Sequence, residues 1–235
     1  VTKAYRENIT LKKVLIYGAG QLGGMVAYIL SYQDDIEIVG FIDDDQTQMG
    51  CEYNGIPVLG SASMLSNLRK EGITGAIVSI GSNKIRSQIA DQLVKSGFEL
   101  INAIHPTAII SKHVRIGHGV IIGSGVNLYV NAVIGNNVFF GPGVIVSHDS
   151  IVRDNVLLSV GSVIGARVDI DPYAFVGAGA TVMPPGWGKN ARLRIAQRAC
   201  VGVGAVVIKD VPQNAVVAGV PAKILKYQEI DDIPS

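Results

Sequence analysis

Residues 123–170 read GSGVNL YVNAVI GNNVFF GPGVIV SHDSIV RDNVLL SVGSVI GARVDI, and this stretch decides the fold. In each block of six, the sixth place is Ile, Leu, Val or Phe, and the fourth is Val, Ala or Ser. Neither an α-helix nor an ordinary strand has that period. A short fixed period predicts a solenoid, in which each unit completes its apolar core by stacking on its neighbours.

The period extends without a slip from His105 to Val182. Three blocks of six make one triangular coil, so residues i and i+18 are expected to stack on one face about 4.8 Å apart. The fourth and sixth places fill the prism, and Gly or small polar residues turn its corners. The pattern breaks at Met183 with the seven residues MPPGWGK and resumes with NARLRI AQRACV GVGAVV.

The N-terminal part has a different pattern, in which strands alternate with helices. An apolar strand runs into the G-x-G-x-x-G of residues 18–23, and a second, Ile36 to Ile42, ends in three aspartates, the first of them twenty residues after Gly23. A third strand, Ala76 to Ile80, leads into Gly-Ser-Asn. The alternation predicts a small parallel sheet of the Rossmann kind.

This alternation stops after one mononucleotide half, whereas a complete NAD domain normally has two. A nucleotide or nucleotide-sugar pocket is therefore favoured over an NAD site. Glycines allow close backbone approach, and a helix N-terminus offers free N–H groups to an anion. We expect the pocket to use the following residues: Gly18, Gly20 and Gln21 near the phosphates, Asp43 and Asp44 toward the base or ribose, and Gly81, Asn83 and Arg86 in the wall.

Composition narrows the functional classes. The net charge is +1, without a basic stripe, so nucleic acid is not an expected partner. The hydrophobic content of 48% is spread at period six, and no apolar run reaches the eighteen or so residues of a membrane span. The two cysteines are too few for a disulfide framework, which is typical of a cytoplasmic protein.

The hexads, the run VPQNAVVAGVPAK at 211–223 and the N-terminal GAGQLG, Asp and GSN motifs resemble one bacterial family. It comprises the nucleotide-sugar acetyltransferases of the left-handed β-helix hexapeptide superfamily that carry a Rossmann-like N-terminal domain. The resemblance implies an α/β Rossmann-like half domain over 1–103 and an all-β left-handed parallel β-helix over 104–235. It also implies a homotrimer with active sites between adjacent helices, and acetyl-CoA as co-substrate.

His148 occupies the second place of its hexad, an outward corner position. From the pattern alone it is equally a surface histidine. The resemblance implies that His148 is the general base, and an imidazole suits the proton transfer from an attacking amine. Asp149 either orients the imidazole or holds the acceptor sugar. Successive side chains on a regular strand point to opposite faces, so orientation by Asp149 requires a corner conformation.

The donor site is expected one coil later, at Gly165 and Ala166. The resemblance implies a backbone amide there that stabilises the oxyanion of the tetrahedral intermediate. Relatives often have Gly in place of Ala166, and some carry a second histidine where this chain has Leu157. Four cations flank the late coils, where relatives bind the phosphates of coenzyme A: Lys189, Arg192, Arg194 and Arg198.

Two other chemistries receive less support from the residues. Cys200 has no histidine near it in sequence, so we expect a packing residue and direct acetyl transfer without an acyl-enzyme. His113 and His118 match the ligand pair of hexapeptide zinc carbonic anhydrases, but the third histidine, which that family supplies from upstream, is missing. We therefore expect no metal site.

The sequence therefore predicts an acetyl-CoA-dependent N-acetyltransferase that acts on the amino group of a nucleotide-linked deoxysugar, in the synthesis of a cell-surface glycan such as lipopolysaccharide. Three alternatives stay open at this point. They are an O-acetyltransferase of the sialic acid type, a catalytically silent hexapeptide protein that binds nucleotide-sugars, and an NAD-dependent enzyme.

Overall fold

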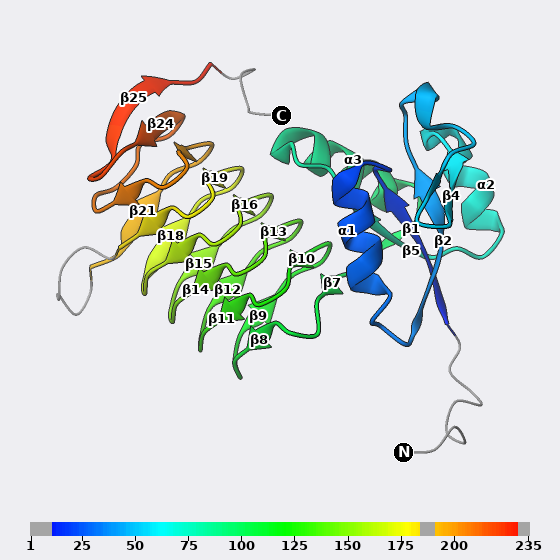
Figure 1. The fold of residues 1–235 in the computed structure, drawn as a ribbon, viewed down its shortest axis with the longest axis horizontal. Helices are drawn as coiled ribbons and strands as arrows, with labels where there is room; N and C mark the ends of the chain where they lie inside the picture. Colours follow the sequence, from blue (N-terminus) through cyan, green and yellow to red (C-terminus); the bar gives the residue numbers. More distant parts are fainter. Residues whose placement is uncertain (1–10, 184–190, 230–235) are drawn as a thin grey trace. The chain divides into compact units, whose positions relative to one another are not determined.

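The computed structural model describes residues 11–183 and 191–229. By their contacts the residues divide into two compact units (Figure 1). The first comprises Val1–Ile80 and Ile89–Ile101, and the second comprises Gly81–Gln88 and Asn102–Ser235. The sequence placed the boundary after residue 103, and the short segment 81–88 is the main difference between the two divisions.

The first unit contains a mostly parallel sheet in the order β3-β4-β2-β1-β5-β6, in which β3 alone runs antiparallel to its neighbour β4. The sheet forms because runs such as VLIY in β1 are apolar on both faces, as expected for a parallel strand covered by helices. The three strands and their helices predicted from the sequence are present. The bounds are β1 Lys12–Tyr17, α1 Gln21–Leu30, β2 Ile36–Ile42, η2 Gln46–Gln48, β3 Glu52–Tyr53, β4 Ile56–Gly60, η3 Ala62–Met64, α2 Leu65–Lys70, β5 Gly75–Val78, α3 Asn83–Lys95 and β6 Glu99–Leu100.

The second unit stacks short strands into three sheets, in which all neighbours are parallel except β25, which pairs antiparallel with β24 (Figure 1). One sheet follows β7-β10-β13-β16-β19-β22-β24-β25, the next β8-β11-β14-β17-β20-β23, and the third β9-β12-β15-β18-β21. The bounds are β7 Ala103–Ile104, β8 Ile109–Ile110, β9 Arg115–Ile116, β10 Ile121–Ile122, β11 Asn127–Leu128, β12 Val133–Ile134, β13 Phe139–Phe140, β14 Ile145–Val146, β15 Ile151–Val152, β16 Leu157–Leu158, β17 Val163–Ile164, β18 Val168–Ile170, β19 Phe175–Val176, β20 Thr181–Val182, β21 Leu193–Ile195, β22 Cys200–Val201, β23 Val206–Val207, β24 Ala215–Ala218 and β25 Lys223–Tyr227.

Strand pairing confirms the predicted coil length. Phe139 pairs with Leu157, and Leu157 pairs with Phe175, each eighteen residues on. Phe175 then pairs with Cys200, twenty-five residues on, which is one coil of eighteen plus the seven-residue excursion. The excursion therefore leaves the register of the prism unchanged.

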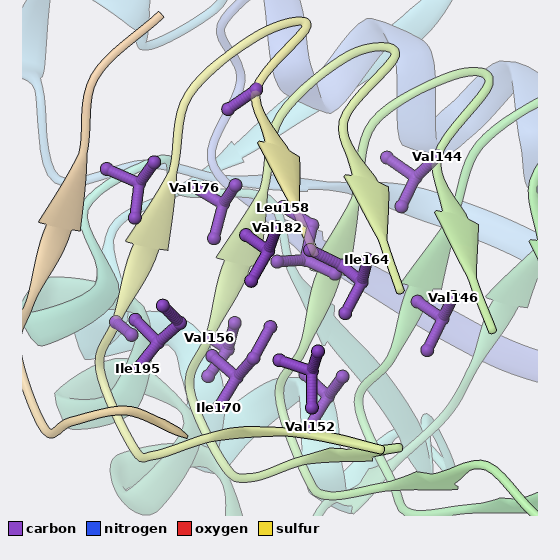
Figure 2. Close-up of a cluster of buried hydrophobic side chains, with 14 of the residues drawn as sticks. Val144, Val146, Val152, Val156, Leu158, Ile164, Ile170, Val176, Val182 and Ile195 are labelled. Carbon is purple, nitrogen blue, oxygen red and sulfur yellow. The ribbon is translucent and has the colours of Figure 1, made fainter. Parts of the chain in front are cut away.

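The core of the second unit consists of the fourth and sixth places of the hexads (Figure 2). The labelled side chains of Figure 2, such as Val146, Ile164 and Val182, point into one continuous apolar column and are fully buried. Two fourth places carry Ser150 and Ser162, and both serines are also fully buried. Each hydroxyl therefore lies within the apolar prism.

The third place of the hexads turns the corners with positive φ. One column of corners uses glycine throughout, from Gly125 to Gly204. Another uses His113, Asn131, Asp149 and Arg167, with φ between 56° and 69°. Left-handed backbone costs an ordinary residue about 1–2 kcal/mol. Asn and Asp tolerate it best, which explains their place in this column.

Candidate active site

His148 and Asp149 lie together at one corner of the second unit. Asp149 has a φ of 59°, so its side chain turns toward the side of its neighbour instead of the opposite face. His148 Nδ1 and Asp149 Oδ2 are 2.8 Å apart, and about half of each side chain is exposed. The corner conformation that orientation by Asp149 requires is therefore present.

Asp149 is held by the preceding coil. Its Oδ1 accepts a hydrogen bond of 3.0 Å from Asn131 Nδ2, and its amide donates to Val130 O at 3.2 Å. The hydrogen bonds from His148 and then from Asn131 lower the pKa of Asp149. An ionised carboxylate only accepts hydrogen bonds, so Nδ1 of His148 carries a proton in this pair. Nε2 is then the imidazole nitrogen with a lone pair that can accept a proton.

The next coil stacks directly on His148. Arg167 N donates to His148 O at 3.1 Å, and Gly165 N donates to Val182 O at 2.8 Å. Within the described residues the amide of Ala166, between these two, makes no hydrogen bond. The positive φ of this corner falls on Arg167, so Ala166 keeps a conformation that suits a side chain. The structure thus leaves one outward N–H available a coil away from the imidazole.

Two of the expected phosphate ligands are engaged with carboxylates. Arg192 pairs with both oxygens of Asp169, and its Nη2 donates to Asp149 O at 2.9 Å. The hydrogen bonds to Asp169 raise the pKa of Arg192. Arg194 lies 2.6 Å from Asp171 Oδ2, a side chain that is only 6% exposed. Arg192 thus binds the backbone of the His148–Asp149 corner instead of presenting a free guanidinium to a phosphate.

The other two predicted phosphate ligands are Arg198 and Lys189. Arg198 lies over the ring of Tyr173, 5.9 Å from its centroid, and is partly exposed. Its Nε is buried and has no hydrogen-bond partner within the described residues. Lys189 lies outside the described residues.

The glycine loop and the first aspartate of the first unit are bonded to each other. Asp43 Oδ2 accepts from Ala19 N at 2.7 Å, and Oδ1 accepts from Asp45 N at 2.9 Å. Gly18 has a φ of 110°, and a Cβ there would lie 2.8 Å from Ser79 Oγ. Asp43 therefore fixes the loop that leads into α1. Each of its two oxygens accepts one backbone hydrogen bond.

Three further residues of this loop cluster are exposed, namely Gly20 and Gln21 at the start of α1, and Asp44. Asp44 accepts from Tyr17 Oη at 2.6 Å and from Ala62 N at 3.0 Å. Burial, followed by the hydrogen bond to Asp44, raises the pKa of Tyr17, so the phenol stays protonated and donates. Gly18, Gly20, Gln21, Asp43 and Asp44 are thus brought together at the carboxyl ends of β1 and β2.

Asn83 and Arg86, which the sequence predicts in the wall of a nucleotide pocket, are both buried. Arg86 is 1% exposed and donates to the carbonyls of Asn137 at 3.0 Å and Asn155 at 3.2 Å. Asn83 Nδ2 donates to Tyr173 O and Ala174 O. Their donors hold backbone carbonyls of the coils, so neither side chain offers a ligand surface. Gly81 is exposed.

Metal and thiol chemistry receive no support from the described residues. Within them no group of three or more His, Cys, Asp or Glu side chains could hold a metal ion. His113 and His118 are both exposed. Burial raises the pKa of the Cys200 thiol, which disfavours the reactive thiolate. No helix among the described residues is long and apolar enough to cross a membrane.

Sequence reasoning missed the residues that support the corner, namely Asn131, Ser150 and Asp169. The signal for Asn131 was available, because it lies eighteen residues before Asp149 and therefore one coil below it. Asp169 reaches the site only through Arg192, which follows the excursion. No spacing in the sequence indicates that contact.

Comparisons with known proteins agree with this architecture. Residues 13–93 match the family described as the PglD N-terminal domain. GDP-perosamine N-acetyltransferase of Escherichia coli O157:H7 is 32% identical over 220 residues, which cover 90% of this chain and 95% of that protein. Because the match extends over nearly the whole length of both proteins, the two proteins belong to one family.

Two solved structures share the fold. One is a GDP-perosamine N-acetyltransferase from Caulobacter crescentus, in which a histidine is replaced by alanine, in complex with CoA and GDP-perosamine. It is 31% identical, with a TM-score of 0.84 over 91% of this chain and 97% of that one. The acetyltransferase domain of PglB from Neisseria gonorrhoeae, in complex with acetyl coenzyme A, is 29% identical, with a TM-score of 0.82 over 92% and 100%. The chain belongs to the family of nucleotide-sugar N-acetyltransferases that join an α/β N-terminal domain to a left-handed parallel β-helix.

Proposed function

We propose that this protein transfers the acetyl group of acetyl-CoA to the amino group of a nucleotide-linked amino-deoxysugar, with His148 as general base. The observation that carries the proposal is the His148–Asp149 hydrogen bond at 2.8 Å, one coil from the available amide of Ala166. The relatives from Escherichia coli and Caulobacter crescentus are both named GDP-perosamine N-acetyltransferases, which supports an amino sugar as acceptor.

The reaction needs one group that accepts a proton and one hydrogen-bond donor that stabilises the oxyanion. The amine nitrogen attacks the thioester carbonyl, a C–N bond forms, and the carbonyl oxygen becomes negatively charged beside the Ala166 N–H. Nε2 of His148 takes the proton that the nitrogen loses. When the intermediate collapses, the C–S bond breaks and the thiolate receives that proton, giving the amide and free CoA. No acyl-enzyme is required.

The acceptor nucleotide is proposed to bind at the loop cluster of the first unit. Gly20 and Gln21 expose the N-terminus of α1, where free N–H groups favour a diphosphate. Asp44 is exposed beside them. For coenzyme A, Arg198 and Lys189 stay as proposed phosphate ligands, because the donors of Arg192 and Arg194 already bind carboxylates. We propose that the working assembly is a cytoplasmic homotrimer, as the resemblance implies.

Release of free thiol from acetyl-CoA tests this proposal. The acceptors are UDP-, dTDP- and GDP-linked amino sugars, with the matching hydroxy sugars in parallel. We expect release with an amino sugar and none with its hydroxy counterpart. Release only with hydroxy sugars would establish O-acetylation, and no release with any acceptor would favour a silent nucleotide-sugar-binding protein.

His148→Ala is expected to lower kcat by about 10²–10⁴-fold, the usual contribution of general-base catalysis, while binding of acetyl-CoA stays within about threefold. His118→Ala is the matched control, since His118 occupies the same second place of its hexad and is also exposed. It should retain full activity. Turnover of His148→Ala within tenfold of the parent would overturn the assignment, and calorimetry measures the binding.

A further inference from the structure

The corners of the β-helix usually close with a hydrogen bond from the fourth-place amide to the first-place carbonyl. Ala174 N donates to Asp171 O at 3.3 Å, and Ala180 N donates to Gly177 O at 3.1 Å. The corner from Gly165 to Val168 lacks this bond, as do the corners that begin at Gly117, Gly123, Gly135, Ser147 and Arg153. The corner from Gly165 to Val168 is the one that carries the Ala166 amide.

Ser150 takes the place of the missing bond. Its Oγ donates to Gly165 O at 2.9 Å and accepts from Val168 N at 3.1 Å. The side chain is fully buried, within the apolar prism. A single hydroxyl therefore bridges the two backbone groups of this corner.

The bridge acts directly on the proposed oxyanion donor. Gly165 C=O and Ala166 N–H belong to the same peptide group, so a hydrogen bond to the carbonyl fixes the plane in which the N–H points. It also polarises that peptide, because hydrogen bonds in a chain strengthen one another. The chain runs from Val168 N–H through the Ser150 hydroxyl to the Gly165–Ala166 peptide.

We propose that Ser150 is a positioning residue for acetyl transfer, holding and polarising the Ala166 amide that stabilises the oxyanion. This inference rests on the proposed function of the Ala166 amide. It makes His148, Asp149 and Ser150 one continuous segment, which supplies the base, its orienting carboxylate and the support of the donor site.

Two other residues of the second unit resemble Ser150 in position or contacts, and comparison with them distinguishes the proposed role from simple packing. Asn102 bridges Gly117 O and Val120 N in the same way, at 2.9 Å each, but there the second-place amide of His118 is already bonded to Asn136 Oδ1. Ser162 is a second fully buried fourth-place serine, and its hydroxyl has no partner within the described residues. Among the corners that the structure describes, bridge and available amide coincide at Ala166.

Ser162→Ala is therefore the matched control for Ser150→Ala. We expect Ser150→Ala to lower kcat about tenfold, a fraction of the 10²–10³ lost when an oxyanion donor itself is removed. The KM values for both substrates should stay within twofold, and the acid limb of the pH profile should not move, because the base is untouched. Ser162→Ala should keep the parent kcat. Ser150→Thr, which retains the hydroxyl, should recover most of the activity.

Two outcomes overturn the proposal. They are equal kcat values for Ser150→Ala and Ser162→Ala, or a shifted acid limb in Ser150→Ala. If Ser150→Ala does not fold, Ser150→Cys replaces it, since the thiol preserves the volume but is a weak donor. Guanidinium denaturation of all variants separates lost folding from lost turnover.

A spectroscopic measurement tests Ser150 without any acceptor. In protein labelled with ¹⁵N-alanine, the Ala166 amide proton is identified by its loss in Ala166→Gly. It should shift upfield in Ser150→Ala and not in Ser162→Ala, because the polarising hydrogen bond is gone. If the Ala166 amide resonance of Ser150→Ala has the same chemical shift as in the parent protein, the proposal for Ser150 is wrong. Absence of thiol release from the parent protein would instead sink the proposed function.

Discussion

At the scale of single residues, the backbone of Asp149 decides whether the two proposed catalytic side chains cooperate. Its φ of 59° brings the carboxylate to the Nδ1 of His148, which a regular strand would not do. The carboxylate in turn is held by Asn131, one coil below. The left-handed conformation is unfavourable for an ordinary residue, and here it occurs at the residue where it brings two functional groups together.

The pH dependence of turnover follows from this arrangement. Hydrogen bonds from His148 and Asn131 lower the pKa of Asp149, so the carboxylate stays ionised as the pH falls toward 5. Between pH 8 and 5, the acid limb of kcat/KM should therefore reflect uptake of one proton, with a slope of about one against pH. Initial rates measured at constant ionic strength across this range test the expectation.

Asp149→Asn should lower kcat, since the carboxylate that holds Nδ1 of His148 is replaced by an amide. Asn131→Ala is the milder companion, because it removes one of two hydrogen bonds to the carboxylate. A slope of two in the parent protein would contradict an Asp149 that stays ionised.

At the scale of elements, the start of α3 is bound to the corners of the β-helix. Arg86 and Asn83 donate to carbonyls of three successive coils, at Asn137, Asn155 and Tyr173. Burial lowers the pKa of Arg86 to about 10, which still leaves it charged at neutral pH. This segment therefore belongs to the second unit, although the sequence pattern assigns it to the first.

Arg86→Met should lower the free energy of unfolding by about 3 kcal/mol, because the charge-assisted hydrogen bonds are lost and buried carbonyls are left unpaired. Lys95→Met on the same helix is the control, since Lys95 is exposed. Guanidinium denaturation followed by circular dichroism measures both. Equal midpoints for the two variants would show that the buried contacts contribute little.

At the scale of the whole chain, the register of the prism connects the base to the donor amide. His148 and Ala166 are neighbours because eighteen residues make one coil, and the pairing of Phe175 with Cys200 shows that the excursion is added without changing that register. The later coils can therefore stack correctly whatever the length of this insertion.

Deleting residues 183–189 is expected to leave the fold intact, since Val182 would then continue directly into the next hexad. The far-UV circular dichroism spectrum and the cooperativity of thermal unfolding should be unchanged. The KM for acetyl-CoA should rise about tenfold, because Lys189 is removed from the proposed phosphate site. Lys189→Ala alone should give the same rise if the charge is responsible. An unchanged KM in both variants would remove Lys189 from the proposal.

The sequence by itself determined the coil length, the inward places and the corner position of His148. A period of six fixes these because each depends only on spacing along the chain, as the pairing of Phe139 with Leu157 shows. The alternation of strands with helices predicted three strands of the six-stranded sheet, namely β1, β2 and β5.

Only the tertiary structure decided which donors and acceptors meet. Arg86 has the appearance of a pocket residue in the sequence, but it is buried against carbonyls more than fifty residues away. Ser150 reads as a small residue at a core place, yet its hydroxyl bridges a turn of the next coil. Hydrogen bonds depend on distances and angles between side chains from different coils, and a one-dimensional period does not contain those.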